Sequence, residues 1–128
     1  MTEKGNAGNS PVEISLYVAP QLLSMAERDR FRVGLTASNK TNMALDPHLY
    51  MVRLLVNGSV SAAFDIALGN GVMPAMWDLL PAGASTSPVD WPLGMALFPE
   101  PGEYLLVLRL EWNDWAPVES SAKVNVTP

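Results

Sequence analysis

Proline and glycine residues interrupt this chain at short intervals. Eleven prolines and nine glycines are spread along its 128 residues rather than gathered in one segment. Proline removes the backbone N–H that a helix interior needs, and both residue types favour turns. Long helices have little room in such a chain, so we expect low helical content and many short elements joined by turns.

Between these breaks, apolar and polar residues alternate with a period of two, which is typical of strands that place one face on a core. The alternation is clear in residues 12–18 and strictest in residues 30–37. Residues 21–30 fit either a short helical turn or a brief extra strand followed by a charged turn. We treat them as a connection.

Two turn signals predict how the middle of the chain is organised. Asn57-Gly58 lies between β-rich segments, and these residue types accept the positive φ angles of a type I′ turn, so we expect a hairpin over residues 49–68. Pro88 interrupts a short strand in residues 84–93. A central strand would need the N–H that proline lacks, so this strand is expected either at a sheet edge or with a bulge.

Residues 101–112 and 120–127 are expected to form the last two strands, joined by a turn. About seven strands with turn signals between them predict an all-β fold, a two-layer antiparallel β-sandwich. We assign residues 12–128 to this single domain and the polar residues 1–11 to a disordered N-terminal tail.

The end of the chain resembles the last three strands of an immunoglobulin-like or fibronectin type III-like domain. The resemblance rests on LLPAGASTSPVDW, PEPGEYLLVLRL and SSAKVNVTP, in that order. It implies an immunoglobulin-like sandwich in which Pro101-Gly102-Glu103-Tyr104 opens the penultimate strand. Tyr104 would then be the corner tyrosine, with a packed ring and a hydroxyl that bonds the backbone of the preceding turn.

The order of motifs is also similar to that of the bacterial intracellular proteinase inhibitor family. An early asparagine–threonine turn, a hairpin, an apolar loop with a tryptophan, LPAG and PGEY follow one another. This resemblance implies the same sandwich and makes inhibition of an intracellular protease a candidate function. We carry over the fold and no inhibitory residue.

Residues that could perform catalysis or bind a metal are few. Cysteine is absent, which excludes disulfides, thiolate metal sites and a cysteine nucleophile. His48 is the only histidine and is expected to be structural. No serine lies in the small-residue turn that exposes a hydrolase nucleophile, and the carboxylates fit turn or rim positions best. We expect a protein that is not an enzyme and uses no cofactor and no metal.

The charge of the chain restricts its partners and its location. A net charge of −5 and an isoelectric point near 4.6 disfavour binding to nucleic acid or to an anionic membrane. The N-terminal segment lacks the features of a secretory signal, and no segment is long and apolar enough to span a bilayer. We therefore expect a cytoplasmic protein.

Residues 69–83, GNGVMPAMWDLLPAG, carry more apolar surface than a solvated loop should. Either this loop plugs one open end of the sandwich, or it is an adaptable methionine-rich contact surface. Both alternatives stay open here. The candidate contact residues are Met73, Met76, Trp77, Leu79 and Trp115.

Four tryptophans exceed what one sandwich core needs. We expect Trp91 and Trp112 to be buried, which leaves Trp77 and Trp115 as candidates for exposed residues of the kind that dominates contact energies. The leading hypothesis is a non-catalytic module that binds a protein partner, or itself as a homo-oligomer, through the 69–83 loop and a sheet edge. The alternatives are a protease inhibitor, whose loop blocks an active site, and a carbohydrate-binding module that stacks sugars on Trp77 or Trp115.

Overall fold

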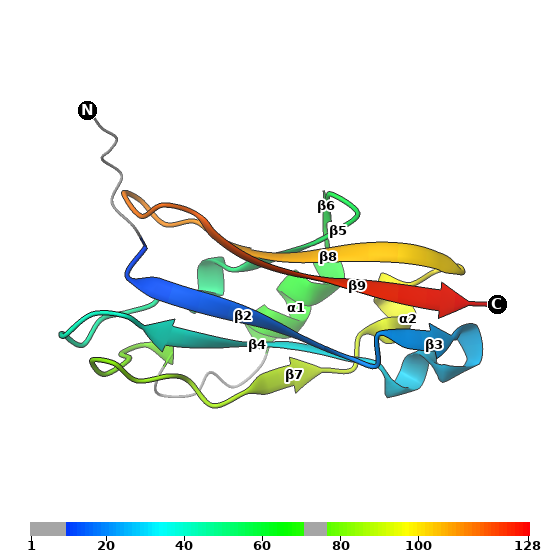
Figure 1. Ribbon diagram of the computed structural model, residues 1–128, viewed down its shortest axis with the longest axis horizontal. Coiled ribbons are helices and arrows are strands. Elements are labelled where there is room, and N and C mark those ends of the chain that lie inside the picture. Colours follow the sequence, from blue (N-terminus) through cyan, green and yellow to red (C-terminus); the bar gives the residue numbers. More distant parts are fainter. Residues whose placement is uncertain (1–9, 71–76) are drawn as a thin grey trace.

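The computed structural model describes residues 10–70 and 77–128, with Asn70 described by its backbone alone. Within these residues the strands form two sheets (Figure 1). The three-stranded sheet has the order β2 (Val12–Ala19), β4 (Arg32–Asn39), β7 (Val89–Trp91). The five-stranded sheet has the order β3 (Leu22–Ser24), β9 (Val118–Thr127), β8 (Gly102–Leu110), β5 (Arg53–Val56), β6 (Ser59–Val60). The prediction of a mostly β protein with two sheets is confirmed.

The chain passes directly from one sheet to the other between β2 and β3, at Pro20, whose preceding peptide bond is cis. All neighbouring strands are antiparallel except β3 and β9, which are parallel. The backbone N–H of Leu16 on β2 donates to the hydroxyl of Ser120 on β9, with 2.8 Å between N and Oγ. This contact joins the two sheets along one side.

Residues 21–30 contain both structures that the sequence left open. Strand β3 is followed by the 3₁₀ helix η1 (Met25–Arg30), and the short helix α2 (Gly94–Leu97) packs against η1. The guanidinium of Arg28 donates to the carbonyl of Phe98, with 2.9 Å between Nη1 and O. These elements cover the end of the sandwich where β9 finishes (Figure 1).

Side chains from both sheets form one buried cluster. On β4, the side predicted to face inward is buried through Val33, Leu35 and Ala37. β8 follows the same period of two and buries Tyr104, Leu106, Leu108 and Leu110. The ring of Tyr104 contacts that of Phe98, with centroids 4.8 Å apart, and its hydroxyl donates to the carbonyl of Glu100 at 2.5 Å.

The Asn57-Gly58 turn is confirmed, with φ angles of 50° and 87° between β5 and β6. The predicted second arm of the hairpin is wrong beyond β6, because residues Ala62–Asn70 form the helix α1. The hydroxyl of Ser61 accepts the N–H of Phe64, with 3.2 Å between Oγ and N, and so caps the first turn. The alanines that follow favour a helix over a strand.

Helix α1 lies over the side of the sandwich beside β7. Its Phe64 and Leu68 are buried in the core. The ring of Phe64 meets that of Trp91 on β7 edge-on, with centroids 5.4 Å apart.

β7 lies at the edge of its sheet, as Pro88 predicted. Gly34 of β4 lies opposite Asp90 of β7, and a Cβ atom built on Gly34 would lie 2.0 Å from the carbonyl oxygen of Val89. Only a residue without Cβ permits this approach of the two backbones. Glycine at position 34 therefore fixes the pairing of β7.

Candidate functional site

Three connections meet at the end of the sandwich where β2 begins (Figure 1). The first is the β4–β5 connection (residues 40–52), which contains the 3₁₀ helix η2 (Leu49–Met51). The second is the segment of residues 80–85 before β7, and the third is the β8–β9 connection (residues 111–117). Leu45 and Leu80 form an antiparallel bridge between the first two. We call this region the loop end.

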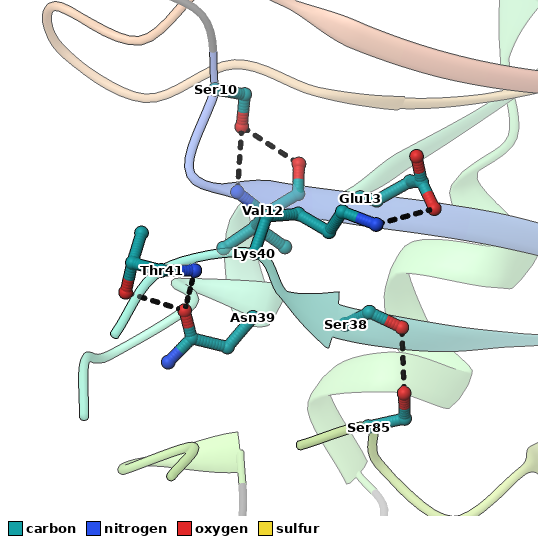
Figure 2. Close-up of polar contacts among 8 residues, drawn as sticks. All are labelled: Ser10, Val12, Glu13, Ser38, Asn39, Lys40, Thr41 and Ser85. Atoms are coloured by element: carbon teal, nitrogen blue, oxygen red, sulfur yellow. Dashed lines mark hydrogen bonds and ion pairs between the residues drawn. The ribbon is translucent and has the colours of Figure 1, made fainter. Parts of the chain in front are cut away.

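Asn39, the last residue of β4, connects the β4–β5 connection with residues 80–85 through a buried side chain that is 2% exposed (Figure 2). Its amide nitrogen lies 2.8 Å, 3.0 Å and 3.2 Å from the carbonyl oxygens of Met43, Leu80 and Pro81. Its Oδ1 accepts hydrogen bonds from the backbone and the hydroxyl of Thr41, at 2.8 Å and 2.7 Å.

The neighbours of Asn39 add further contacts between segments (Figure 2). Ser38 and Ser85 share a hydrogen bond, with 2.7 Å between their hydroxyl oxygens. The ammonium group of Lys40 lies 3.7 Å from the carboxylate of Glu13 on β2. These backbone and side-chain contacts hold the β4–β5 connection and residues 80–85 to each other and to the ends of β2 and β4.

Four aromatic side chains from two of these connections form a cluster at the loop end, which we call the aromatic patch: His48, Tyr50, Trp112 and Trp115. The imidazole of His48 stacks on the indole of Trp112, with centroids 3.8 Å apart and an interplanar angle of 17°. The ring centroids of Trp115 and His48 lie 5.5 Å apart. Tyr50 meets both His48 and Trp112 at steep angles, with centroid distances of 5.9 Å and 6.3 Å.

Two tight turns place these rings. His48 has a positive φ of 55°, and its N–H donates to the side-chain Oδ1 of Asp46 at 2.8 Å. In the other connection Asn113 has a φ of 39°, and the N–H of Trp115 donates to the carbonyl of Trp112 at 2.8 Å. Asparagine tolerates this left-handed backbone better than most residues, so the sequence Trp-Asn-Asp-Trp favours the turn.

Charged residues flank the patch. Arg109 on β8 forms ion pairs with Glu111 and with Glu119 of β9, which lies opposite it in the strand register. The hydrogen bond from Arg109, helped by its charge, lowers the pKa of Glu111 below the usual glutamate value. The same two carboxylates raise the pKa of Arg109. Asp46 is next to His48 of the patch, with its Oδ2 3.7 Å from Nδ1 of the imidazole.

The candidate contact residues of the 69–83 loop differ from one another in their exposure to solvent. Met73 and Met76 lie outside the described residues. Trp77 is 2% exposed and belongs to the core cluster, which corrects the expectation that its indole is exposed. Its apolar ring fills space between the sheets instead of facing solvent. Leu79 is 59% exposed, and the adjacent Leu80 is buried at the bridge to Leu45.

The tryptophans of the second half are also placed differently from the prediction. Trp115 is half-buried and packs against the core while it takes part in the aromatic patch. Trp91 and Trp112, expected in the core, are half-buried too. Sequence reasoning gave no binding role to His48, Tyr50 or Trp112. The turn sequences beside His48 and Trp112 were the available signal, and Tyr50 had none.

Among residues 10–70 and 77–128, no group of three or more His, Asp or Glu side chains is placed to hold a metal ion. Across the same part of the chain, none of the helices has the length and apolar character needed to cross a membrane. The aromatic rings of the patch are thus flanked by the guanidinium of Arg109 and by the exposed carboxylates of Glu111 and Asp46.

Neither a scan against protein-family models nor a search of curated proteins finds a match to this chain. No family is shown by these comparisons, so the resemblance to immunoglobulin-like domains and to the intracellular proteinase inhibitor family stays a prediction.

Proposed function

We propose that this protein is a non-catalytic, immunoglobulin-like interaction domain that binds a protein partner at its loop end. The strand order supports the immunoglobulin-like type. β2, β4 and β7 are neighbours as strands A, B and E are in that fold, and β5, β8 and β9 are neighbours as strands C, F and G are. The hydrogen bond from Tyr104 to the carbonyl of Glu100 also fits a tyrosine corner.

In immunoglobulin-like domains, the connections between strands B and C and between F and G lie at the same end of the sandwich. The corresponding connections here carry the four rings of the aromatic patch. Tryptophan and tyrosine at the centre of an interface supply large rigid contact area, and residues of this kind dominate the energy of many protein contacts. The aromatic patch is the single observation that carries the proposal.

The 69–83 loop takes a smaller part in this proposal than the sequence suggested. Among its described residues the exposed large apolar side chain is Leu79, and Met43, in the connection that the Leu45–Leu80 bridge joins to this loop, is 70% exposed. These two side chains provide an apolar flank at the same end. A contact that centres on the patch can extend over them.

Variants of the patch test the proposal. Partners are captured from native lysate on immobilised protein and identified, and their affinity for the purified protein is then measured. Trp112→Ala and Trp115→Ala should each weaken that binding by about tenfold or more, because they remove central aromatic contacts. Tyr17→Ala removes a ring that is 49% exposed on β2, outside the patch, and serves as the control.

Circular dichroism and sedimentation establish that each variant stays folded and show whether the wild-type protein associates with itself. Equal affinity for wild-type protein and for both tryptophan variants would refute the loop end as the binding surface. A captured protease that loses activity on binding would assign the inhibitor function to the same surface.

A further inference from the structure

A depression of about 320 Å³ lies between η2, β5 and α1, beside the aromatic patch. Its walls are formed by Tyr50, Arg53, Asp65, Leu68 and Gly69. Pockets for small ligands span about 300–1,000 Å³ and combine apolar walls with a few placed polar groups. This depression is at the small end of that range and has both kinds of wall. We call it the Tyr50 pocket.

The guanidinium of Arg53 is held in a fixed position at one side of the pocket. Its Nη1 donates to the backbone carbonyls of Tyr50 and Val52, at 3.1 Å and 2.9 Å. Nη2 makes no hydrogen bond to any of the residues that the structure describes. The side chain of Arg53 is 42% exposed, so the guanidinium is accessible to a ligand while Nη1 holds it in place.

Asp65, in the first turn of α1, forms an ion pair with this guanidinium but no hydrogen bond. Its Oδ1 lies 3.7 Å from Nε of Arg53, which is beyond hydrogen-bond distance, and this buried oxygen has no hydrogen-bond partner among the described residues. Buried polar atoms normally have a partner. Since the side chain is 37% exposed overall, its carboxylate is also within reach of a ligand.

Tyr50 gives the pocket an aromatic wall. The residue is 50% exposed, and no described ring stacks on it, because His48 and Trp112 meet it at interplanar angles of 74° and 70°. Its hydroxyl lies 3.3 Å from Nδ1 of His48. These contacts brace the ring from the patch side.

The charges select the chemistry of the ligand. An anion would be repelled by Asp65 and a cation by Arg53, so the pair suits a neutral group that both donates and accepts hydrogen bonds. Two adjacent hydroxyls of a sugar satisfy both side chains, one donating to the carboxylate and one accepting from the guanidinium. The C–H face of a pyranose ring packs well on an aromatic side chain such as Tyr50. We propose that the Tyr50 pocket binds a neutral sugar unit.

This proposal goes beyond protein binding at the aromatic patch and shares only Tyr50 with it. It also differs from sugar stacking on Trp77 or Trp115, because the polar groups of the site come from β5 and α1. The test uses the full chain, labelled with ¹⁵N, and titrates it with methyl pyranosides and short oligosaccharides of the common neutral sugars.

A binding sugar should shift the amide signals of Arg53, Asp65 and Leu68 in a saturable manner. Asp65→Asn and Arg53→Met should each weaken the affinity at least about tenfold, as expected for lost hydrogen bonds to charged groups. Tyr50→Ala should do the same, whereas Tyr50→Phe, which keeps the ring, should restore binding. Asp29→Asn and Arg30→Met, at the opposite end of the molecule, are the matched controls.

The dispersion of the amide spectrum shows that each variant is folded. The proposal is overturned if no sugar of the panel shifts these signals, or if the variants of Asp65 and Arg53 bind as tightly as wild type. It is also overturned if peptides with asparagine or glutamine shift the signals and sugars do not. Trp115→Ala should weaken the protein contact and leave sugar affinity unchanged, and Asp65→Asn should do the reverse, so the two proposals fail separately.

Discussion

Asn39 connects two segments of the loop end, residues 40–52 and residues 80–85, through one side chain. Its amide group reaches the carbonyls of Met43, Leu80 and Pro81, and its carbonyl oxygen receives two hydrogen bonds from Thr41. Water cannot replace these partners, because the residue is 2% exposed. The geometry of these loops therefore depends on a side-chain amide at position 39.

Replacement of Asn39 by aspartate should therefore be strongly destabilising, although the two side chains have nearly the same shape. The carboxylate has no N–H to donate and would place a negative charge against three carbonyl oxygens. We expect a loss on the order of 3 kcal/mol in the free energy of unfolding. Urea denaturation measures it. Asn42→Asp, at an exposed neighbouring position, is the control, and equal effects of the two substitutions would contradict this role of Asn39.

At the scale of single elements, β7 depends on the absence of a side chain at Gly34. A methyl group there would meet the carbonyl oxygen of Val89 at 2.0 Å and Cβ of Asp90 at 2.6 Å. We expect Gly34→Ala to cost at least about 2 kcal/mol, because β7 must move away from β4.

The same substitution in α1 is the matched comparison. Among the residues that the structure describes, no atom lies within 4 Å of the position of a Cβ on Gly69, so Gly69→Ala should raise stability by up to about 1 kcal/mol through helix propensity alone. Thermal denaturation of both variants should show a lower melting temperature for Gly34→Ala and a higher one for Gly69→Ala. A neutral Gly34→Ala variant would mean that β7 is not held as described.

The ion pair between Arg109 of β8 and Glu111, which follows the end of this strand, predicts a dependence of stability on pH. The pKa of Glu111 is lowered by Arg109, so the folded state releases this proton more readily than the unfolded chain does. The stabilisation is present above the ordinary glutamate value of 4.5 and is lost as the pH falls through the lower pKa of the folded state.

The difference in melting temperature between wild type and Glu111→Gln should consequently shrink on acidification. Because these side chains are exposed, the effect should be small and should decrease with added salt. Glu103→Gln, at the other end of β8, serves as the reference. A difference that stays constant across the acidic range would show that the pair does not act on stability.

Several elements could be predicted from the sequence because their pattern follows directly from burial of one face. The period of two placed β2, β4, β8 and β9, and Pro88 placed β7 at an edge. Helix α1 was missed because its apolar residues followed the Asn57-Gly58 turn and suggested the second arm of a hairpin. A local helix signal was present in Ser61, the alanines after it and Asp65 in the first turn. The expected hairpin was given more weight than this signal.

For the molecule as a whole, Trp77 belongs to the core that both sheets and α1 share. Trp77→Ser should cost about 3–5 kcal/mol, because it leaves a large cavity and a hydroxyl in an apolar environment. Leu79→Ser, two residues away and 59% exposed, should change stability by no more than about 0.5 kcal/mol. The urea denaturation midpoints of the two variants and of the wild type measure this difference. If Trp77→Ser is also neutral, the indole does not fill the core.

The candidate site could not be assembled from the sequence. His48 and Tyr50 meet Trp112 and Trp115 only because the β4–β5 and β8–β9 connections end at the same side of the sandwich. That proximity depends on strand order and register, which no local pattern specifies. Trp115 was found because it lies in a turn, while Tyr50 has a strand-like context and gave no such signal.

The buried amide of Asn39 also has a consequence for producing the protein. Asn39-Lys40-Thr41 is an acceptor sequence for N-linked glycosylation, an attachment made in a eukaryotic secretory pathway. An oligosaccharide on this nitrogen would remove a donor from the loop end and could not fit at a position that is 2% exposed. Chains modified there should be retained as misfolded material. A bacterial host, which leaves this asparagine bare, is therefore the suitable source of folded protein.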